Sequence, residues 1–166
     1  GSASDLANLL KKKLGERLTN LQFHKDYDTV SLKIDGINID LATARTEVYK
    51  KPGFNPQVSP STIEEDLSRR DFSINAIAFD FLNSKLMDPY GGINTLRKRE
   101  LELLHQKSIS DDPTRIIRAA RYAARLDFYI ADNSLQQIKS TLKSWPWNYS
   151  LSNSIKFVPP ALSSRL

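Results

Sequence analysis

The sequence contains no cysteine, which excludes disulfide bonds and any metal site built on thiolates. Its two histidines are too few for a histidine-rich metal site. A catalytic metal would therefore depend on oxygen ligands, which favours magnesium. The sequence also lacks an apolar run of membrane-spanning length and a signal peptide, so we expect a cytoplasmic protein with no membrane partner.

Positive charge is in excess, with 24 lysines and arginines against 19 aspartates and glutamates. The formal net charge of +5 favours a polyanionic partner such as RNA or the phosphates of a nucleotide. The length of 166 residues suffices to bury a core, but it indicates no oligomeric state. Gly1-Ser2 is typical of an expression scar and residues 159–166 of a turn before another helix, so we expect a piece of a longer protein.

The hydrophobic pattern predicts strands and helices in the first part of the chain and only helices in the second. A helix over residues 5–18 precedes a β-hairpin between Thr29 and Leu41, which turns at Asp35-Gly36. Residues 49–61 contain three prolines, which is typical of a mobile loop. Further helices are expected at about residues 62–70, 93–100, 112–126 and 133–142.

The change from mixed to all-helical structure places a domain boundary near residue 106. An α/β (α+β) domain is expected at residues 1–106 and a helical one at residues 107–166. Residues 87–92 are expected to form a turn, and the sequence after Trp145 has no regular pattern. Four apolar residues that follow the helix at 62–70 are expected to be buried: Phe72, Ile74, Ile77 and Phe79.

Asp40 is the first residue suited to chemistry. Because Ile39 and Leu41 point to the core, Asp40 projects from the opposite face of its strand. A carboxylate on a rigid strand is a suitable magnesium ligand. From periodicity alone, a solvent-exposed side chain with no special role is the more ordinary interpretation.

Two cations, a carboxylate and an amide gather at the end of the helix predicted at 62–70: Arg69, Arg70, Asp71 and Asn75. The planar donors of arginine suit the oxygens of a triphosphate, while a carboxylate or an amide suits the hydroxyls of a ribose. The alternative is that the arginines only complement the dipole at the C-terminal end of the helix. The sequence leaves both interpretations open.

Asp112 and Arg115 stand three residues apart at the start of a helix and share one face. The exocyclic amine of cytosine or adenine would donate to Asp112, and the neighbouring ring nitrogen would accept from Arg115. Uracil and guanine present the reverse pattern, and an unsatisfied buried polar group costs on the order of 1–3 kcal/mol. Such a pair selects C and A without a nucleic-acid template; the alternative is an N-capping aspartate beside an incidental arginine.

The same helix has a basic side, formed by Arg115, Arg118, Arg121 and Arg125. Apolar residues lie opposite, at Ile116, Ala119, Ala120 and Ala123. The basic side is suited to an RNA backbone or, alternatively, to acidic groups of the neighbouring domain.

Four ordered motifs resemble those of the class II tRNA nucleotidyltransferases (CCA-adding enzymes) and bacterial poly(A) polymerases, within the DNA polymerase β superfamily. They occupy residues 39–45, 65–78, 87–92 and 111–121. The resemblance implies a partial polymerase-β-like nucleotidyltransferase head at residues 1–106 and an all-helical neck at residues 107–166. It also implies a transferase of tRNA processing that adds C and A (CCA) to tRNA 3′ ends from CTP and ATP.

The resemblance assigns roles to the candidate residues. Asp40 takes the position of the third catalytic carboxylate and would bind Mg2+. Residues 69–71 handle the sugar and triphosphate of the incoming nucleotide, and Asp112 with Arg115 reads its base. The resemblance assigns no role to Arg118, Arg121 and Arg125, which stay candidates for contact with RNA because of their position on the basic side.

The sequence departs from the family pattern at Asp111, where glutamate is more usual, and more seriously at its start. The family opens with a Gly-Gly turn and an Asp-x-Asp pair that binds two magnesium ions, and this chain supplies neither. Asp26-Tyr27-Asp28 has the spacing but belongs by resemblance to the next strand. The body and tail domains of the family are also missing. One carboxylate cannot hold two metal ions in catalytic geometry, so we expect these 166 residues alone to have little or no activity.

Three other functions are compatible with the same motifs. The first is a bacterial poly(A) polymerase, and the second is an A-only or CC-only adding enzyme. The third, of a different class, is a non-catalytic RNA- or nucleotide-binding homologue that has lost the metal-binding pair.

Overall fold

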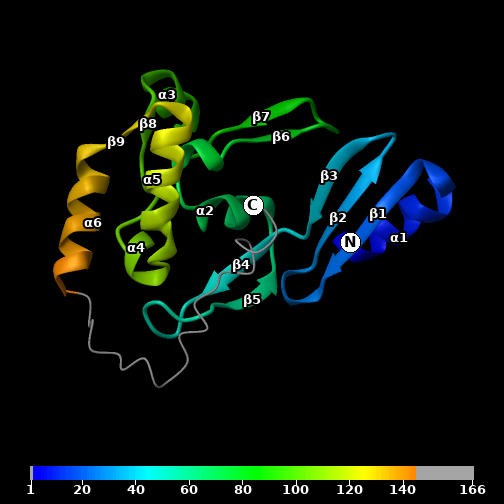
Figure 1. Ribbon diagram of the computed structural model, residues 1–166, viewed down its shortest axis with the longest axis horizontal. Helices are drawn as coiled ribbons and strands as arrows, with labels where there is room; N and C mark the ends of the chain where they lie inside the picture. Colours follow the sequence, from blue (N-terminus) through cyan, green and yellow to red (C-terminus); the bar gives the residue numbers. More distant parts are fainter. Residues whose placement is uncertain (1, 145–166) are drawn as a thin grey trace.

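The computed structural model describes residues 2–144 of the chain, and the expectations for residues after Trp145 lie outside them. Helices and strands are mixed along the chain (Figure 1), which confirms the predicted α/β (α+β) class. They are α1 (Ala3–Leu14), β1 (Leu18–His24), β2 (Thr29–Ile34), β3 (Ile37–Ala42), β4 (Arg45–Val48), β5 (Gln57–Pro60), α2 (Ile63–Ser68), β6 (Ala78–Asp80), β7 (Lys85–Met87), α3 (Gly92–Lys98), β8 (Glu100–Leu101), α4 (Ser108–Asp111), α5 (Thr114–Leu126), β9 (Tyr129–Ile130) and α6 (Asp132–Ser144). Within the described range, no helix has the length and apolar character needed to cross a bilayer.

The N-terminal part of the chain is an antiparallel sheet of strand order β1-β2-β3, with α1 packed against it (Figure 1). The predicted hairpin is confirmed, since β2 and β3 pair up to Ile34 and Ile37 on either side of Asp35-Gly36. Both turn residues have positive φ angles (48° and 86°), which suits the twist of the two strands. A small core lies between helix and sheet, formed by Ala3, Ala7, Leu18, Val30 and Leu32.

The helix predicted over residues 5–18 is too long at its C-terminal end. α1 ends at Leu14, because Gly15 adopts a φ of 57°, and the chain then enters β1. Leu18 is the only fully buried residue of β1. The strand therefore lacks the alternation of apolar and polar residues by which a sequence pattern indicates a strand.

Asp28 fastens the start of α1 to the sheet. Its carboxylate accepts hydrogen bonds from the backbone N–H groups of Ala3 (3.1 Å) and Ser4 (3.3 Å), from Ser4 Oγ (2.6 Å) and from Thr43 Oγ1. The hydrogen bonds from Ser4 and then Thr43 are the main reason that the pKa of Asp28 is lowered. The assignment of Asp26-Tyr27-Asp28 to a strand is wrong in detail, because residues 25–27 form a single 3-10 turn and Asp28, with a φ of 41°, directly precedes β2.

The stretch 49–61 is more regular than predicted. Its second half forms β5, which pairs antiparallel with β4 from Arg45 and Pro60 to Val48 and Gln57. The connecting loop is therefore confined to residues 49–56. Gly53 in this loop donates its N–H to the carbonyl oxygens of Ser110 and Asp111 (3.1 and 3.2 Å), which places the loop beside the end of α4.

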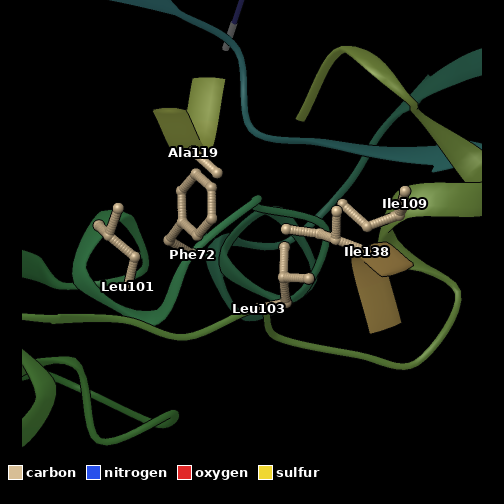
Figure 2. Packing of buried hydrophobic residues seen from close by; sticks show 6 residues of the cluster. All are labelled: Phe72, Leu101, Leu103, Ile109, Ala119 and Ile138. Carbon is tan, nitrogen blue, oxygen red and sulfur yellow. The ribbon is translucent and has the colours of Figure 1, made fainter. Parts of the chain in front are cut away.

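A second core joins the middle of the chain to the C-terminal helices, and Figure 2 shows its buried side chains. They are Phe72, Leu101, Leu103, Ile109, Ala119 and Ile138. Phe72 is fully buried and packs edge-to-face against Tyr122, with ring centroids 5.9 Å apart. β8 and β9 add a short parallel pair between the same two parts of the chain. The core thus includes residues from both sides of position 106, where the domain boundary stays a prediction.

The predicted burial is confirmed for Phe72 and wrong for Phe79. Phe79 is 48% exposed on the β6–β7 hairpin, which extends away from the helices (Figure 1) and where it packs against Phe81 with ring centroids 5.1 Å apart. Ile74 and Ile77 are half-buried. A two-stranded hairpin buries few of its side chains, so apolar residues in it do not imply a core position.

The segment predicted as a turn, residues 87–92, ends in a glycine that packs directly against the backbone of Ser73. A Cβ atom at Gly92 would lie 2.2 Å from the carbonyl oxygen of Ser73, so no larger residue fits without a shift of the backbone. Asp88 accepts hydrogen bonds from the N–H groups of Gly92 (2.6 Å) and Ile93 (3.0 Å) and so starts α3.

Candidate nucleotide site

An arginine–carboxylate cluster lies where α2, the β4–β5 hairpin and α5 meet. α2 ends at Ser68, and helical spacing places Arg69 and Arg70 three and four residues after Asp66. α5 contributes Arg115 and Arg118, which bond to the segment at residues 69–71. The residues that sequence reasoning selected at 69–75 and at 115–118 are therefore brought together by the fold.

Asp66 is the centre of this cluster and is 3% exposed. Its Oδ1 accepts hydrogen bonds from Arg69 Nε (3.1 Å), Arg69 Nη2 (2.5 Å) and the N–H of Arg45 (3.2 Å). Its Oδ2 accepts from Arg70 Nε (3.1 Å) and Arg70 Nη2. Burial acts to raise the pKa of Asp66, but the hydrogen bonds from Arg70 and Arg69 outweigh it, and the pKa is lowered.

Glu47 is a second buried acceptor in the cluster. Its Oε1 accepts from Arg45 Nη2 (2.9 Å) and from Arg69 Nη1 (2.8 Å), and its Oε2 accepts from the Tyr49 hydroxyl (2.9 Å). Burial, followed by the charge of Glu47, raises the pKa of Tyr49 far above its usual range, so Tyr49 stays a neutral donor. Sequence reasoning missed Glu47 and Asp66. The available signal was the alternation of Arg45, Glu47 and Tyr49, which places three polar side chains on one face of β4 and its extension.

The lowered pKa of Asp66 predicts a loss of stability in acid. A carboxylate whose pKa is lower in the folded state stabilises the fold above its unfolded pKa of 3.8, and this contribution disappears as the pH falls through the folded value. We expect the difference in unfolding free energy between the wild type and Asp66→Asn to be largest near pH 7 and to shrink below about pH 4. Urea unfolding of both proteins at pH 7 and pH 3 measures it. An undiminished difference at pH 3 would contradict the assigned charge state.

Asp71 pairs with Arg118 of α5. Its Oδ2 accepts from Arg118 Nε (2.6 Å), and its Oδ1 accepts from Asn75 Nδ2 (2.8 Å) and from the N–H of Phe72 (2.9 Å). The Arg118 guanidinium also lies 5.5 Å from the centre of the Tyr122 ring. Burial opposes the ionised state of Arg118, but the charge of Asp71 and its hydrogen bond raise the pKa of Arg118 above its usual value.

The basic side of α5 is less uniform than its sequence pattern indicates. Arg115 is 5% exposed, and Arg118 is paired with Asp71, while Arg121 and Arg125 are exposed. Ala120, expected on the apolar side, is exposed as well. The sequence allowed two roles for the basic side of α5, and Arg118 has one of them, the pairing with an acidic group. The contact of these arginines with RNA stays a prediction.

Asp112 starts α5 and also faces Arg115. Its Oδ1 accepts hydrogen bonds from the N–H (3.0 Å) and the hydroxyl (2.5 Å) of Thr114, so the capping interpretation holds for this oxygen. Its Oδ2 lies 3.8 Å from Arg115 Nε and accepts no hydrogen bond from residues 2–144. Capping and base reading are therefore compatible, because they use different oxygens of one carboxylate.

Asp40 lies on β3 of the N-terminal sheet. It is exposed, as predicted, and its Oδ1 accepts a hydrogen bond from Ser31 Oγ on the neighbouring strand (2.7 Å). Carboxylate oxygen is the donor that magnesium prefers, so Asp40 fits as one ligand. The part of the chain that the structure describes contains no group of three or more acidic, histidine or cysteine side chains able to hold a metal ion. The other ligands would have to come from phosphates, water or further carboxylates.

Comparison with known proteins gives consistent matches. The family described as the poly(A) polymerase head domain matches residues 1–102. An A-adding tRNA nucleotidyltransferase of Aquifex aeolicus is 37% identical over 146 residues, which are 86% of this chain and 17% of that protein. A CC-adding tRNA nucleotidyltransferase of Deinococcus radiodurans is 41% identical over 124 residues, which are 72% of this chain and 33% of that protein. The chain thus spans about a third or less of the length of these relatives.

A solved structure of a CCA-adding enzyme, in an apo form, resembles this chain in three dimensions. The TM-score is 0.75 and the sequence identity 38%, over 87% of this chain and 34% of that one. This coverage extends beyond residue 102, where the family match ends. The likeness therefore includes part of the helical segment that carries Asp112 and Arg115.

Proposed function

This chain belongs to the family of the poly(A) polymerase head domain, and we propose that it is the nucleotide-selecting part of a tRNA nucleotidyltransferase. The whole enzyme would add C and A (CCA) to tRNA 3′ ends from CTP and ATP. The names of the similar proteins, an A-adding, a CC-adding and a CCA-adding enzyme, support this proposal. Since the substrate would be tRNA, the cytoplasm is the expected place of action.

The observation that carries the proposal is the arrangement of Asp112 and Arg115. Asp112 Oδ2 faces Nε of the Arg115 guanidinium, which is held in place by hydrogen bonds from Nη1 to Ser108 Oγ and from Nη2 to the carbonyl oxygen of Arg69. An amine of cytosine or adenine donates to this carboxylate oxygen, and the adjacent ring nitrogen accepts from the arginine. Uracil and guanine would place a carbonyl against the carboxylate and a ring N–H against the guanidinium. The selection of C and A follows from this difference.

The arginines of α2 would bind the triphosphate. The side chains of Arg69 and Arg70 are 18% and 40% exposed, and Asp66 holds both. Fixed arginines lose little entropy when they bind phosphate oxygens. Asp71 and Asn75, which are hydrogen-bonded to each other, would accept from the ribose hydroxyls.

Catalysis would join the nucleotide to RNA by attack of the 3′ hydroxyl on the α-phosphate, with pyrophosphate as the leaving group. Mg2+ bound at Asp40 would stabilise the charge that develops on the phosphate oxygens. Arg121 and Arg125, exposed on α5, remain the candidates for contact with the RNA backbone. The 166-residue chain alone stays predicted to be inactive, because it contributes only one carboxylate, that of Asp40, to the metal site.

Nucleotide incorporation by the complete gene product tests this function. We expect it to add C and A to a tRNA transcript that lacks CCA, and Asp40→Ala to abolish the addition. Addition of A alone to a transcript ending in CC would identify an A-only adding enzyme, and addition of CC alone would identify a CC-only adding enzyme. Long A tails on unstructured RNA would assign a poly(A) polymerase. No incorporation into any RNA would contradict the proposal and favour a non-catalytic binding protein.

A further inference from the structure

Ser108 is a buried polar residue for which the sequence analysis gave no role. It is 0% exposed, opens α4, and its hydroxyl accepts a hydrogen bond of 2.6 Å from Arg115 Nη1. A bond of this length from a charged donor is strong. Ser108 thus contacts one half of the pair proposed to read the base.

The protein holds three of the five N–H groups of Arg115. The two on Nη1 point to Ser108 Oγ and to the carbonyl oxygen of Arg70 (3.4 Å), and one on Nη2 points to the carbonyl oxygen of Arg69 (2.8 Å). Two N–H groups remain, on Nε and on Nη2. Nε is the nitrogen 3.8 Å from Asp112 Oδ2. The donors left for a ligand are therefore those on the side of Asp112.

Ser108 itself is rigidly placed. Its N–H donates to the carbonyl oxygen of His105 (3.0 Å), and that oxygen also accepts from Gln137 Nε2 on α6 (3.1 Å). The other end of the same amide, Gln137 Oε1, accepts the N–H of Ile109 (3.3 Å). α6 therefore clamps the start of α4 from both sides of Ser108. The hydroxyl is held at a fixed point relative to the core.

We propose that Ser108 is a positioning residue for base selection, which acts by fixing the rotation of the Arg115 guanidinium toward Asp112. The inference rests on the function proposed above. Among the described residues, no buried side-chain N or O atom lacks a hydrogen-bond partner. Removal of the Ser108 hydroxyl leaves a buried donor on Nη1 without its partner. The guanidinium then rotates to satisfy it and no longer presents Nε and Nη2 to the base.

The test is the affinity of the chain for CTP and for UTP, measured by calorimetric titration in the wild type, Ser108→Ala and Ser110→Ala. Ser110 lies on the same helix, and its hydroxyl bonds to the carbonyl oxygen of Lys107 at the surface, so Ser110→Ala is a matched control. We expect Ser108→Ala to lower the preference for CTP over UTP about tenfold, as for the loss of one hydrogen bond to a charged group. The affinity for inorganic triphosphate, which does not depend on base reading, should stay unchanged in both variants.

A double-mutant cycle separates positioning from a general structural effect. Arg115→Lys removes the planar fork, so Ser108→Ala in that background should lower the preference no further. An unchanged preference in Ser108→Ala, or an equal loss in both backgrounds, would overturn the inference. If Ser108→Ala does not fold, Ser108→Cys, with a weak acceptor of similar size, is judged by the same criteria. A wild type that shows no preference would instead contradict the proposed function.

Discussion

Asp66→Asn is expected to lower the free energy of unfolding by about 3 kcal/mol, as for other buried ion pairs that lose one partner. The substitution keeps the shape of the side chain but removes the charge that Arg69 and Arg70 share. The amide also has one acceptor oxygen in place of two, so at least one guanidinium loses its partner. Urea unfolding at pH 7 gives the change in free energy directly.

Glu64→Gln is the matched control for this prediction. Glu64 is exposed in the first turn of the same helix, where a carboxylate is worth roughly 0.3–1 kcal/mol through the helix dipole. The same preparations should show a weaker affinity for inorganic triphosphate in Asp66→Asn, because its arginines are no longer held. If Asp66→Asn is as stable as Glu64→Gln, the cluster is not organised around Asp66.

Asp112→Asn is expected to abolish the preference for CTP and ATP over UTP and GTP. The amide oxygen keeps the Oδ1 position, which accepts from Thr114, so an NH2 group replaces Oδ2. This group donates to a carbonyl where the carboxylate accepted from an amine, while Arg115 still favours the ring nitrogen of C and A. The cost that excludes uracil and guanine, on the order of 1–3 kcal/mol, is then removed. Affinities for the four nucleotides should converge to within about threefold, where the wild type separates them by about tenfold or more.

Asp127→Asn provides the control at the other end of α5. Asp127 is exposed and has a φ of 56°, a conformation that asparagine also tolerates. The variant makes the same chemical change to the same helix, and its nucleotide preference should equal that of the wild type. A preference that survives in Asp112→Asn would assign base selection to other residues.

The elements that the sequence predicts well are those with a local cause. The hairpin at Asp35-Gly36 follows from two strands that each alternate apolar and polar residues, and α2 begins directly after its N-cap Thr62, whose hydroxyl accepts the N–H of Glu65. β1 and β5 are different, because they bury few side chains and leave no period in the sequence. Such strands depend on pairing with distant residues.

In the candidate site, too, the residues with a local signal were predicted, and those that depend on distant partners were missed. The residues at 69–75 and at 112–115 were selected from their chemistry and from family motifs, and the fold brings 69–71 against α5. Glu47 escaped selection because its partner Arg69 lies 22 residues away. The burial of Arg115 was equally hidden, since a row of arginines on a helix indicates an exposed face unless acceptors on another element are known. Here the acceptors are backbone carbonyls and Ser108.

The most direct test of base selection by Asp112 and Arg115 is the affinity of the unmodified 166-residue chain for the four ribonucleoside triphosphates, with magnesium present. The account predicts that CTP and ATP bind about tenfold or more tightly than UTP and GTP, since each rejected base leaves a buried polar group unsatisfied. Equal affinities for all four nucleotides would contradict it.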